Sequence, residues 1–233
     1  MRRLLILILA ASVPVWGASP SVAYTQVDVG STSSAINTTG ASLLVIVEFC
    51  YNGPDPASYS PNDSKSNSWH YIQTYTGNHT SIGIWYAWAP TVGTSHTFSA
   101  PSGCSYGHID ITAYSGVQTL SNPLDKQNGY GVSKAATIQP GSITPTVNGE
   151  LIVSACASVL SSGAVTVDSG FAVQNSWTNN SVYFSDAYLV QSTAAAINPT
   201  WTVPGYSGSY GEVAVVASFK PASITAKGFG NVM

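Results

Sequence analysis

An internal repeat constrains the fold of this chain more than any other feature of its sequence. The segment SYGHIDITAYS at residues 105–115 is followed in the second half by SYGEVAVVASFK at residues 209–220, with the same opening tripeptide and the same apolar alternation. Alternation with a period of two is typical of a β-strand with one face in a core. We therefore expect each segment to be a core strand that closes one half of the molecule, with Ile109 and Val213 on equivalent faces.

Further matched segments precede these two strands in the same order, which favours duplication of a whole half. The matched pairs are ASLLVIV at residues 41–47 with GELIVSA at 149–155, Asp63-Ser64 with Asp168-Ser169, residues 81–89 with 181–189, and Thr97-Phe98 with Thr200-Trp201. We expect one domain over residues 24–221, with sequence-similar halves at about residues 24–115 and 135–221.

Short β-like segments separated by turn residues predict an all-β protein. No apolar stripe of helical period is longer than two turns outside the N-terminal run. This pattern favours an antiparallel two-sheet sandwich of jelly-roll-like form. Either the halves interleave in one sandwich, or each half forms its own immunoglobulin-like sandwich. We prefer one sandwich, because the joining segment at residues 116–149 contains β-like stretches of its own.

Several of these segments together resemble a known group of proteins. The succession LLVIV, DSKSNSW, IGIWYAW, ITAYSGV with NPLD soon after, ITPTVNGELIV and VAVVASFKP is similar to a diffuse group of secreted bacterial and phage-associated β-sandwich proteins. The similarity covers nearly all of the chain after its N-terminal segment. The resemblance implies a jelly-roll-like fold and an extracellular or surface role, and it supplies no catalytic residues.

The N-terminal segment has the layout of a secretory signal peptide. Arg2 and Arg3 precede an apolar run at residues 4–13, and small residues follow, with cleavage expected after Gly17, Ser19 or Ala23. We therefore predict a signal peptide over residues 1–23, a secreted protein, and no membrane insertion once the signal is removed. Residues 222–233 are expected to form a flexible tail.

The charge content excludes some classes of partner. Charged residues make up 7% of the chain, and its two arginines both lie in the predicted signal peptide. Nucleic-acid binding needs clustered lysine and arginine, so we expect no nucleic-acid partner. The surface should be polar but uncharged, as is common in extracellular β proteins.

Three cysteines in an exported chain allow one disulfide bond and leave one thiol. Cys50 ends the apolar strand predicted from residue 43, and Cys104 comes just before the strand predicted from residue 107. These positions meet at one end if the strands are antiparallel neighbours or face each other across the sandwich. We predict a Cys50–Cys104 disulfide bond and a buried thiol at Cys156.

Three groups of residues suggest catalysis or metal binding, but each has a simpler structural interpretation. The sequence GCSYG at residues 103–107 matches the serine-hydrolase pattern, but a strand follows it where that pattern needs a helix. His108, Asp110 and Glu48 are metal-ligand or acid–base types, and we expect them to be solvent-facing residues of a sheet. We assign no catalytic residue.

Oxygen-bearing side chains in the long loop at residues 52–68 suggest calcium. Asn62, Asp63 and Asn67 are suitable ligand types, but their spacing matches no defined calcium loop and Lys65 lies among them. An Asx-type turn is the simpler interpretation. We assign no metal ligand and expect no cofactor.

The densest aromatic region favours binding. Rings exposed on a sheet stack well on sugars, so we predict ligand binding by Trp69, Tyr71 and Trp85, with the amide of Asn67 as a hydrogen-bonding partner. We predict a secreted, non-catalytic protein that binds a glycan or a surface protein, or has a structural role, at an extracellular surface. The alternatives are a hydrolase acting on polysaccharides, which needs two facing carboxylates, and a self-assembling matrix or appendage subunit.

Overall fold

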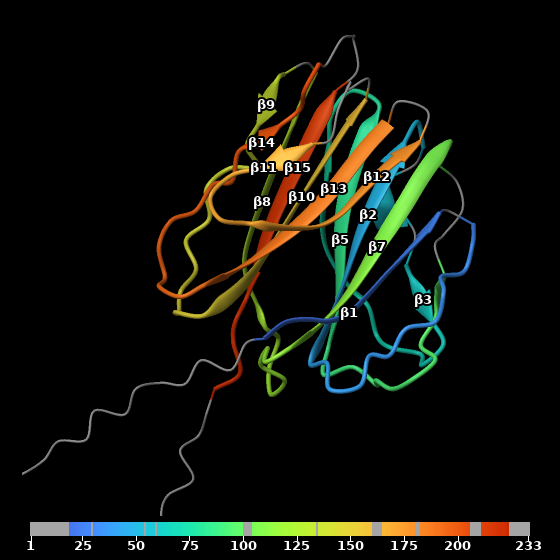
Figure 1. The fold of residues 1–233 in the computed structure, drawn as a ribbon, viewed down its shortest axis with the longest axis vertical. Coiled ribbons are helices and arrows are strands. Elements are labelled where there is room, and N and C mark those ends of the chain that lie inside the picture. The colour runs from blue at the N-terminus through green and yellow to red at the C-terminus, as the bar shows by residue number, and fades with distance from the viewer. Residues whose placement is uncertain are drawn as a thin grey trace, which may run out of the picture.

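The computed structural model describes residues 19–28, 30–53, 55–58, 60–99, 104–133, 135–159, 165–179, 182–205 and 211–223. Two five-stranded antiparallel sheets pack face to face in this part of the chain (Figure 1). The predicted all-β, antiparallel two-sheet sandwich is therefore confirmed. Residues 1–18 of the predicted signal peptide and residues 224–233 of the predicted tail lie outside the described residues.

Each half of the chain forms one of the two sheets. The first sheet has the order β1-β7-β2-β5-β4. Its strands are β1 (Ser19–Asp28), β2 (Leu43–Tyr51), β4 (His70–Thr76), β5 (Thr80–Trp88) and β7 (Tyr106–Ser115). The second sheet has the order β12-β13-β10-β15-β8. Its strands are β8 (Leu124–Val132), β10 (Glu150–Val159), β12 (Ala172–Asn179), β13 (Val182–Gln191) and β15 (Glu212–Phe219).

The two sheets have the same strand order when each is read from its first strand. β1, β7, β2, β5 and β4 correspond to β8, β15, β10, β13 and β12. The chain therefore forms one sandwich, as preferred, but its halves do not interleave. Each half completes a sheet, and the sandwich arises where the two sheets meet. The two sheets thus have equivalent strand order, whereas the sequence similarity of the two halves stays a prediction.

The central strands β2 and β10 are covered on both faces. Leu43 and Val45 on β2 and Val153 on β10 belong to one apolar cluster between the sheets, whereas Leu44 on β2 faces outward. The outer face of the first sheet packs against Phe98 in the pair β3 (Asn62–Asp63) and β6 (Phe98–Ser99). The outer face of the second sheet packs against the three-stranded sheet of β11 (Thr166–Val167), β14 (Trp201–Thr202) and β9 (Thr137–Ile138).

Two-sided burial explains why the central strands are continuous apolar runs without clear alternation. The described part of the chain also includes the short 3-10 turn η1 (Pro56–Ser58). None of the helical structure in the described residues is long and apolar enough to cross a membrane.

The repeated Ser-Tyr-Gly segments do not occupy equivalent faces. In β7, Ile109 packs on the outer face of the first sheet, whereas in β15 Val213 packs between the sheets. Val47 pairs with Asp110, and the matched Ala155 pairs with Val215, so Asp110 corresponds to Val215. The expected equivalence of Ile109 and Val213 is wrong, because a shift of one residue moves every side chain of a strand to the other face.

A disulfide bond joins Cys50, near the end of β2, to Cys104, just before β7. The two strands are antiparallel neighbours, with Cys50 opposite Gly107. Cross-links of this kind typically stabilise a protein by about 2–4 kcal/mol, chiefly through the unfolded chain. Cys156 is a buried free thiol on β10.

Glycines close one edge of the sandwich. Strand β4 lies against β8, and a Cβ atom on Gly131 of β8 would lie 1.9 Å from the Thr76 carbonyl oxygen of β4. A Cβ atom on Gly211 would lie 2.1 Å from the backbone nitrogen of Asn78. The two backbones approach this closely because neither glycine has a side chain.

Substitution of Gly131 by Ala is therefore expected to destabilise the protein by on the order of 3 kcal/mol, because the backbone of β4 must move away. Gly40→Ala is the control, since a Cβ atom at Gly40 meets nothing within 4 Å and strains just the backbone, at φ +87°. That control should cost about 1 kcal/mol. Urea unfolding measures both, and equal losses would contradict close approach at this edge.

Candidate functional site

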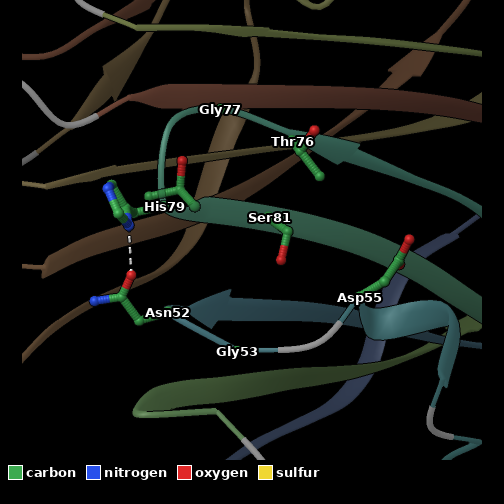
Figure 2. Close-up of a pocket in the computed structure, with 8 residues that line it drawn as sticks. Asn52, Gly53, Asp55, Thr76, Gly77, His79 and Ser81 are labelled. Atoms are coloured by element: carbon green, nitrogen blue, oxygen red, sulfur yellow. Dashed lines mark hydrogen bonds between the residues drawn. The ribbon is translucent and has the colours of Figure 1, made fainter.

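A polar pocket lies where β2 ends and the β4–β5 hairpin turns. It encloses about 530 Å³ and is lined by Asn52, Gly53, Asp55, Thr76, Gly77, His79, Thr80 and Ser81. Figure 2 shows Asn52 and His79 together on one side of the pocket and Asp55 on the other. The volume is within the range of small-molecule sites. The lining supplies amide, carboxylate, imidazole and hydroxyl groups.

Two residues in left-handed backbone conformations form one wall of this pocket. Asn52 has φ 47° and His79 has φ 68°. The Asn52 backbone nitrogen donates to the His79 carbonyl at 3.0 Å, and His79 Nδ1 is 2.6 Å from Asn52 Oδ1 (Figure 2). Because an amide oxygen accepts, Nδ1 is the donor. Non-glycine residues rarely adopt positive φ, and such positions are frequent at binding sites.

Neighbouring groups hold this wall in place. Ser105 donates its hydroxyl to the Asn52 carbonyl at 3.1 Å. The Tyr51 ring lies 6.4 Å from the His79 ring and 6.0 Å from that of Tyr106. Tyr51 and Tyr106 are half-buried, so aromatic surface adjoins the polar wall. Polar groups beside aromatic surface are a combination suited to sugars.

The floor of the pocket is fixed by bonds to the backbone. Ser81 donates its hydroxyl to the Cys50 carbonyl at 3.4 Å, and Thr80 donates to the Gly211 carbonyl at 2.9 Å. His79 and Ser81 both line the pocket, and the Ser81 hydroxyl is directed to the Cys50 carbonyl. The arrangement therefore favours recognition of a ligand over activation of a serine nucleophile.

A buried carboxyl group lies behind the pocket. The pKa of Glu48 is raised to about 8. Burial is the main cause and the charge of Asp55 adds to it, whereas a hydrogen bond from Trp85 lowers the pKa in part. Trp85 Nε1 is 3.2 Å from Glu48 Oε2. Glu48 is 1% exposed and does not line the pocket, whereas Asp55 does. Glu48 is therefore neutral at pH 7.

Glu48, His108 and Asp110 do not form one group. Glu48 pairs with Ile109 in the sheet and shares its outward face, whereas His108 and Asp110 point toward the second sheet. Both are 1% exposed. The prediction that these residues face solvent is therefore wrong, because the second sheet and the layer on the outer face cover both sides of β7.

The predicted aromatic ligand residues form a packed layer on the outer face of the first sheet. Trp85 is 6% exposed. Tyr71 lies on it with ring centres 4.8 Å apart and bonds to Thr74 through its hydroxyl. Trp69 donates its indole N–H to Asp63 at 2.9 Å. These rings cover the sheet, with Trp85 buried and Trp69 and Tyr71 half-buried, and ligand binding by them stays a prediction.

Asn67 is held by its own loop. Its side-chain nitrogen donates to Asp63 and to the Thr91 carbonyl, both at 3.1 Å, and its oxygen accepts from the Thr91 nitrogen at 2.6 Å. Asn67 also lines a smaller cavity of about 290 Å³ together with His70 and Trp88. That cavity is separate in its lining from the pocket at Asn52 and His79.

Asp63 organises the long loop by accepting several hydrogen bonds. Its oxygens accept from the backbone nitrogens of Lys65 and Asn67, from the Asn67 amide and from the indole of Trp69, and His96 Nε2 lies at 2.9 Å. Burial raises the pKa of Asp63, but the bonds from His96, Lys65 and Trp69 outweigh it and hold the pKa below its ordinary value. These donors match the Asx-type turn. Within the described residues no group of three or more His, Cys, Asp or Glu could hold a metal ion.

The pocket was not singled out from the sequence. Asn52 begins the loop predicted at residues 52–68, and Asn78 is a residue type that favours turns. The contact between Asn52 and His79 depends on β2 and β5 being paired, with Tyr51 opposite Thr80. A turn signal contains no information about the other turn that it will meet.

Replacement of Asp63 by Ala should destabilise the protein by on the order of 3 kcal/mol, because several donors lose their acceptor. Asp168→Ala is the matched control from the second half. Asp168 is exposed and accepts from Thr200 at 2.7 Å and from Ser169 at 2.7 Å, and its loss should cost about 1 kcal/mol. Chemical denaturation compares them, and similar losses would contradict the central role of Asp63.

The raised pKa of Glu48 makes stability depend on pH. Folded Glu48 keeps its proton to about pH 8, whereas the unfolded chain releases it near the ordinary value of 4.5. Its contribution is therefore fully present below about pH 4.5 and is lost as pH rises to 8. Glu48→Gln should remove this pH dependence. Between pH 5 and pH 9 the free energy of unfolding of the variant, measured in urea, should therefore rise relative to that of the wild type. Parallel pH profiles would contradict the assignment.

Comparison with known proteins adds no family to this description. No protein-family model, no curated protein and no solved structure is significantly similar to the chain. What the pocket can bind therefore follows from its own geometry and chemistry.

Proposed function

We propose that this chain is a secreted, non-catalytic carbohydrate-binding protein that acts at an extracellular surface through the pocket at Asn52 and His79. The observation that carries the proposal is the chemistry of that pocket, in which amide, carboxylate, imidazole and hydroxyl groups adjoin the aromatic side chain of Tyr51, whose ring lies 6.4 Å from that of His79. A neutral sugar presents many hydroxyl groups and one or more apolar ring faces; the lining offers hydrogen-bonding partners to the hydroxyl groups, and the neighbouring Tyr51 ring offers apolar surface.

The shape of the wall supports a preformed site. Asn52 and His79 hold each other through a backbone bond and a side-chain bond, and the backbone of each is in a conformation that costs free energy. A ligand would therefore meet groups whose freedom is already restricted, which lowers the entropy cost of binding. Asp55 would add an acceptor for a pair of sugar hydroxyls.

Secretion is part of the proposal and rests on the N-terminal sequence together with the Cys50–Cys104 disulfide bond, since such bonds persist in oxidising compartments. Strand β1 begins at Ser19, within the predicted signal peptide, and pairs with β7. Of the three predicted cleavage positions, Gly17 is therefore the one that would leave the whole strand in the mature protein.

A polysaccharide hydrolase is the second candidate. Glycosidases use one carboxyl group as an acid and another as a base. Burial raises the pKa of Glu48, which favours its protonated form, and the carboxyl group of Asp55 lines the pocket, so the two residues are candidates for these roles. A catalytic acid must touch the glycosidic oxygen, but Glu48 accepts a hydrogen bond from Trp85 and does not line the pocket. Binding is therefore the better supported function.

The test is binding of the secreted chain to an array of neutral oligosaccharides, with affinities then measured by calorimetry for each sugar retained. His79→Gly and Asn52→Gly remove one polar side chain each while keeping positive φ accessible. Each should weaken binding about tenfold, as expected for the loss of one or two hydrogen bonds.

The matched control is Ser169→Gly, which changes another residue with positive φ, at 61°, outside the pocket lining. It should bind as the wild type does. Unchanged affinity in both pocket variants, or no retained sugar on the array, would overturn the proposal. Release of reducing sugar from a retained oligosaccharide would instead support the hydrolase.

A further inference from the structure

One side of the space between the two sheets is polar. The face of β7 toward the second sheet comprises His108, Asp110, Thr112 and Tyr114, all buried, whereas the corresponding face of β15 comprises Val213, Val215, Ala217 and Phe219. Such a row has to be satisfied by partners from the facing sheet, because an unpaired buried polar group is costly. We call the row and its partners on β1, β12 and β13 the polar seam.

A β-bulge supplies the partners from β12. In its pairing with β13, Val173 lies opposite Ala187 and Asn175 lies opposite Asp186, so Gln174 is the extra residue. Both amides then reach the first sheet. Gln174 Nε2 is 3.3 Å from Thr112 Oγ1, and Asn175 Nδ2 is 2.8 Å from Asp110 Oδ1. Bulges commonly redirect a side chain in this way next to functional sites.

The carbonyl group of Gln174 is polarised. The hydroxyl of Tyr114 donates to Gln174 Oε1 at 2.5 Å. Tyr114 is fully buried, and burial raises its pKa well above the ordinary value, with a further contribution from the charge of Asp186. The phenol therefore stays protonated and would stabilise negative charge that develops on this oxygen.

A pair of carboxyl groups lies beside these residues. Asp110 Oδ1 accepts from Tyr24 at 3.0 Å and from Asn175, and His108 Nε2 lies at 2.9 Å. Among the described residues, Asp110 Oδ2 and Asp186 Oδ1 have no hydrogen-bond donor. Burial, and then the charge of Asp110, raise the pKa of Asp186 well above its ordinary value. Asp186 is therefore held toward its protonated form beside the charge of Asp110, so that the pair can offer an acid and a base.

We propose that Thr112 and Gln174 join through an intramolecular ester bond that links the two sheets. The oxygen of the Thr112 hydroxyl attacks the side-chain carbonyl carbon of Gln174, and the carboxylate of the pair accepts the hydroxyl proton. Negative charge forms on Gln174 Oε1, where Tyr114 donates. The carbon–nitrogen bond then breaks, the carboxyl pair gives a proton to the departing nitrogen, and ammonia leaves. No oxidant or cofactor is needed, and the pair ends as it began.

The surroundings favour this reaction over hydrolysis of the amide. Thr112 is 3% exposed and Tyr114 is 1% exposed, so water has little access, whereas the Thr112 hydroxyl already lies 3.3 Å from the amide nitrogen of Gln174. Holding a nucleophile against its electrophile raises the effective concentration by many orders of magnitude. The Thr112–Gln174 contact also lies near the β1–β12 edge, opposite the edge that Gly131 and Gly211 close.

The test is the intact mass of the purified, reduced and denatured chain, with its N-terminus determined independently. The expected mass is lower than that of the sequence by one molecule of ammonia. A Lys-specific protease separates Thr112, between Lys65 and Lys126, from Gln174, between Lys134 and Lys220. The two peptides should be recovered as one linked species, which hydroxylamine should cleave because it attacks esters.

Variants locate the bond. Thr112→Val and Gln174→Leu should restore the full mass, and Asp186→Asn should slow or prevent the loss of ammonia. Thr178→Val, an exposed threonine on β12, is the matched control and should keep the linked species. A full mass for the wild type, or a loss of ammonia confined to the Asn128-Gly129 peptide as a cyclic imide, would overturn the proposal.

Discussion

The face-to-face packing of the two sheets is the interaction on which the rest of the molecule depends, with β10 against β5 and β13 against β2. The central strands β2 and β10 are each covered on two faces, so their side chains join three apolar layers in one structure. Burial of apolar surface contributes about 25 cal/mol per Å², and these layers contain most of the buried apolar residues. The pocket begins where β2 leaves this packing, and the polar seam lies to one side of it.

The two sheets have the same strand order, but the two edges of the sandwich, where β4 meets β8 and where β1 meets β12, differ in their contacts. Where β4 meets β8, glycines let the backbones touch. Where β1 meets β12, Asn175 joins Gln26 and Asp110 through its amide. The one-residue difference in facing between β7 and β15 underlies this contrast, because it directs His108 and Asp110 inward in one half and leaves Val213 and Val215 at the corresponding positions in the other. Two copies of one topology thus have different chemistry between the sheets.

The sequence predicted fold class well and site geometry poorly, for physical reasons. Alternation and turn residues are local, so the strands and the all-β sandwich could be predicted. Cys50 and Cys104 could be paired because each lies at an end of a recognisable strand. The burial of Trp85 could not be predicted, because β propensity and alternation do not show which loop will cover a face of the sheet.

Long-range contacts set the remaining features. The bulge at Gln174 depends on its register with β13. The meeting of Asn52 with His79 depends on the pairing of β2 with β5. The shared Ser-Tyr-Gly tripeptide even suggested the wrong alignment of β7 with β15, because a short identical segment does not determine which face a strand presents.

The division of the sheets between the halves also affects how the chain is made. Residues up to Ser115 contain every strand of the first sheet, so its ladder of backbone bonds can form before the second half has emerged. Until β10 and β15 arrive, Leu43, Val45 and Phe49 have no covering layer. The chain would therefore pass through a stage with a broad apolar sheet open to water, when it is most exposed to aggregation and most in need of a chaperone.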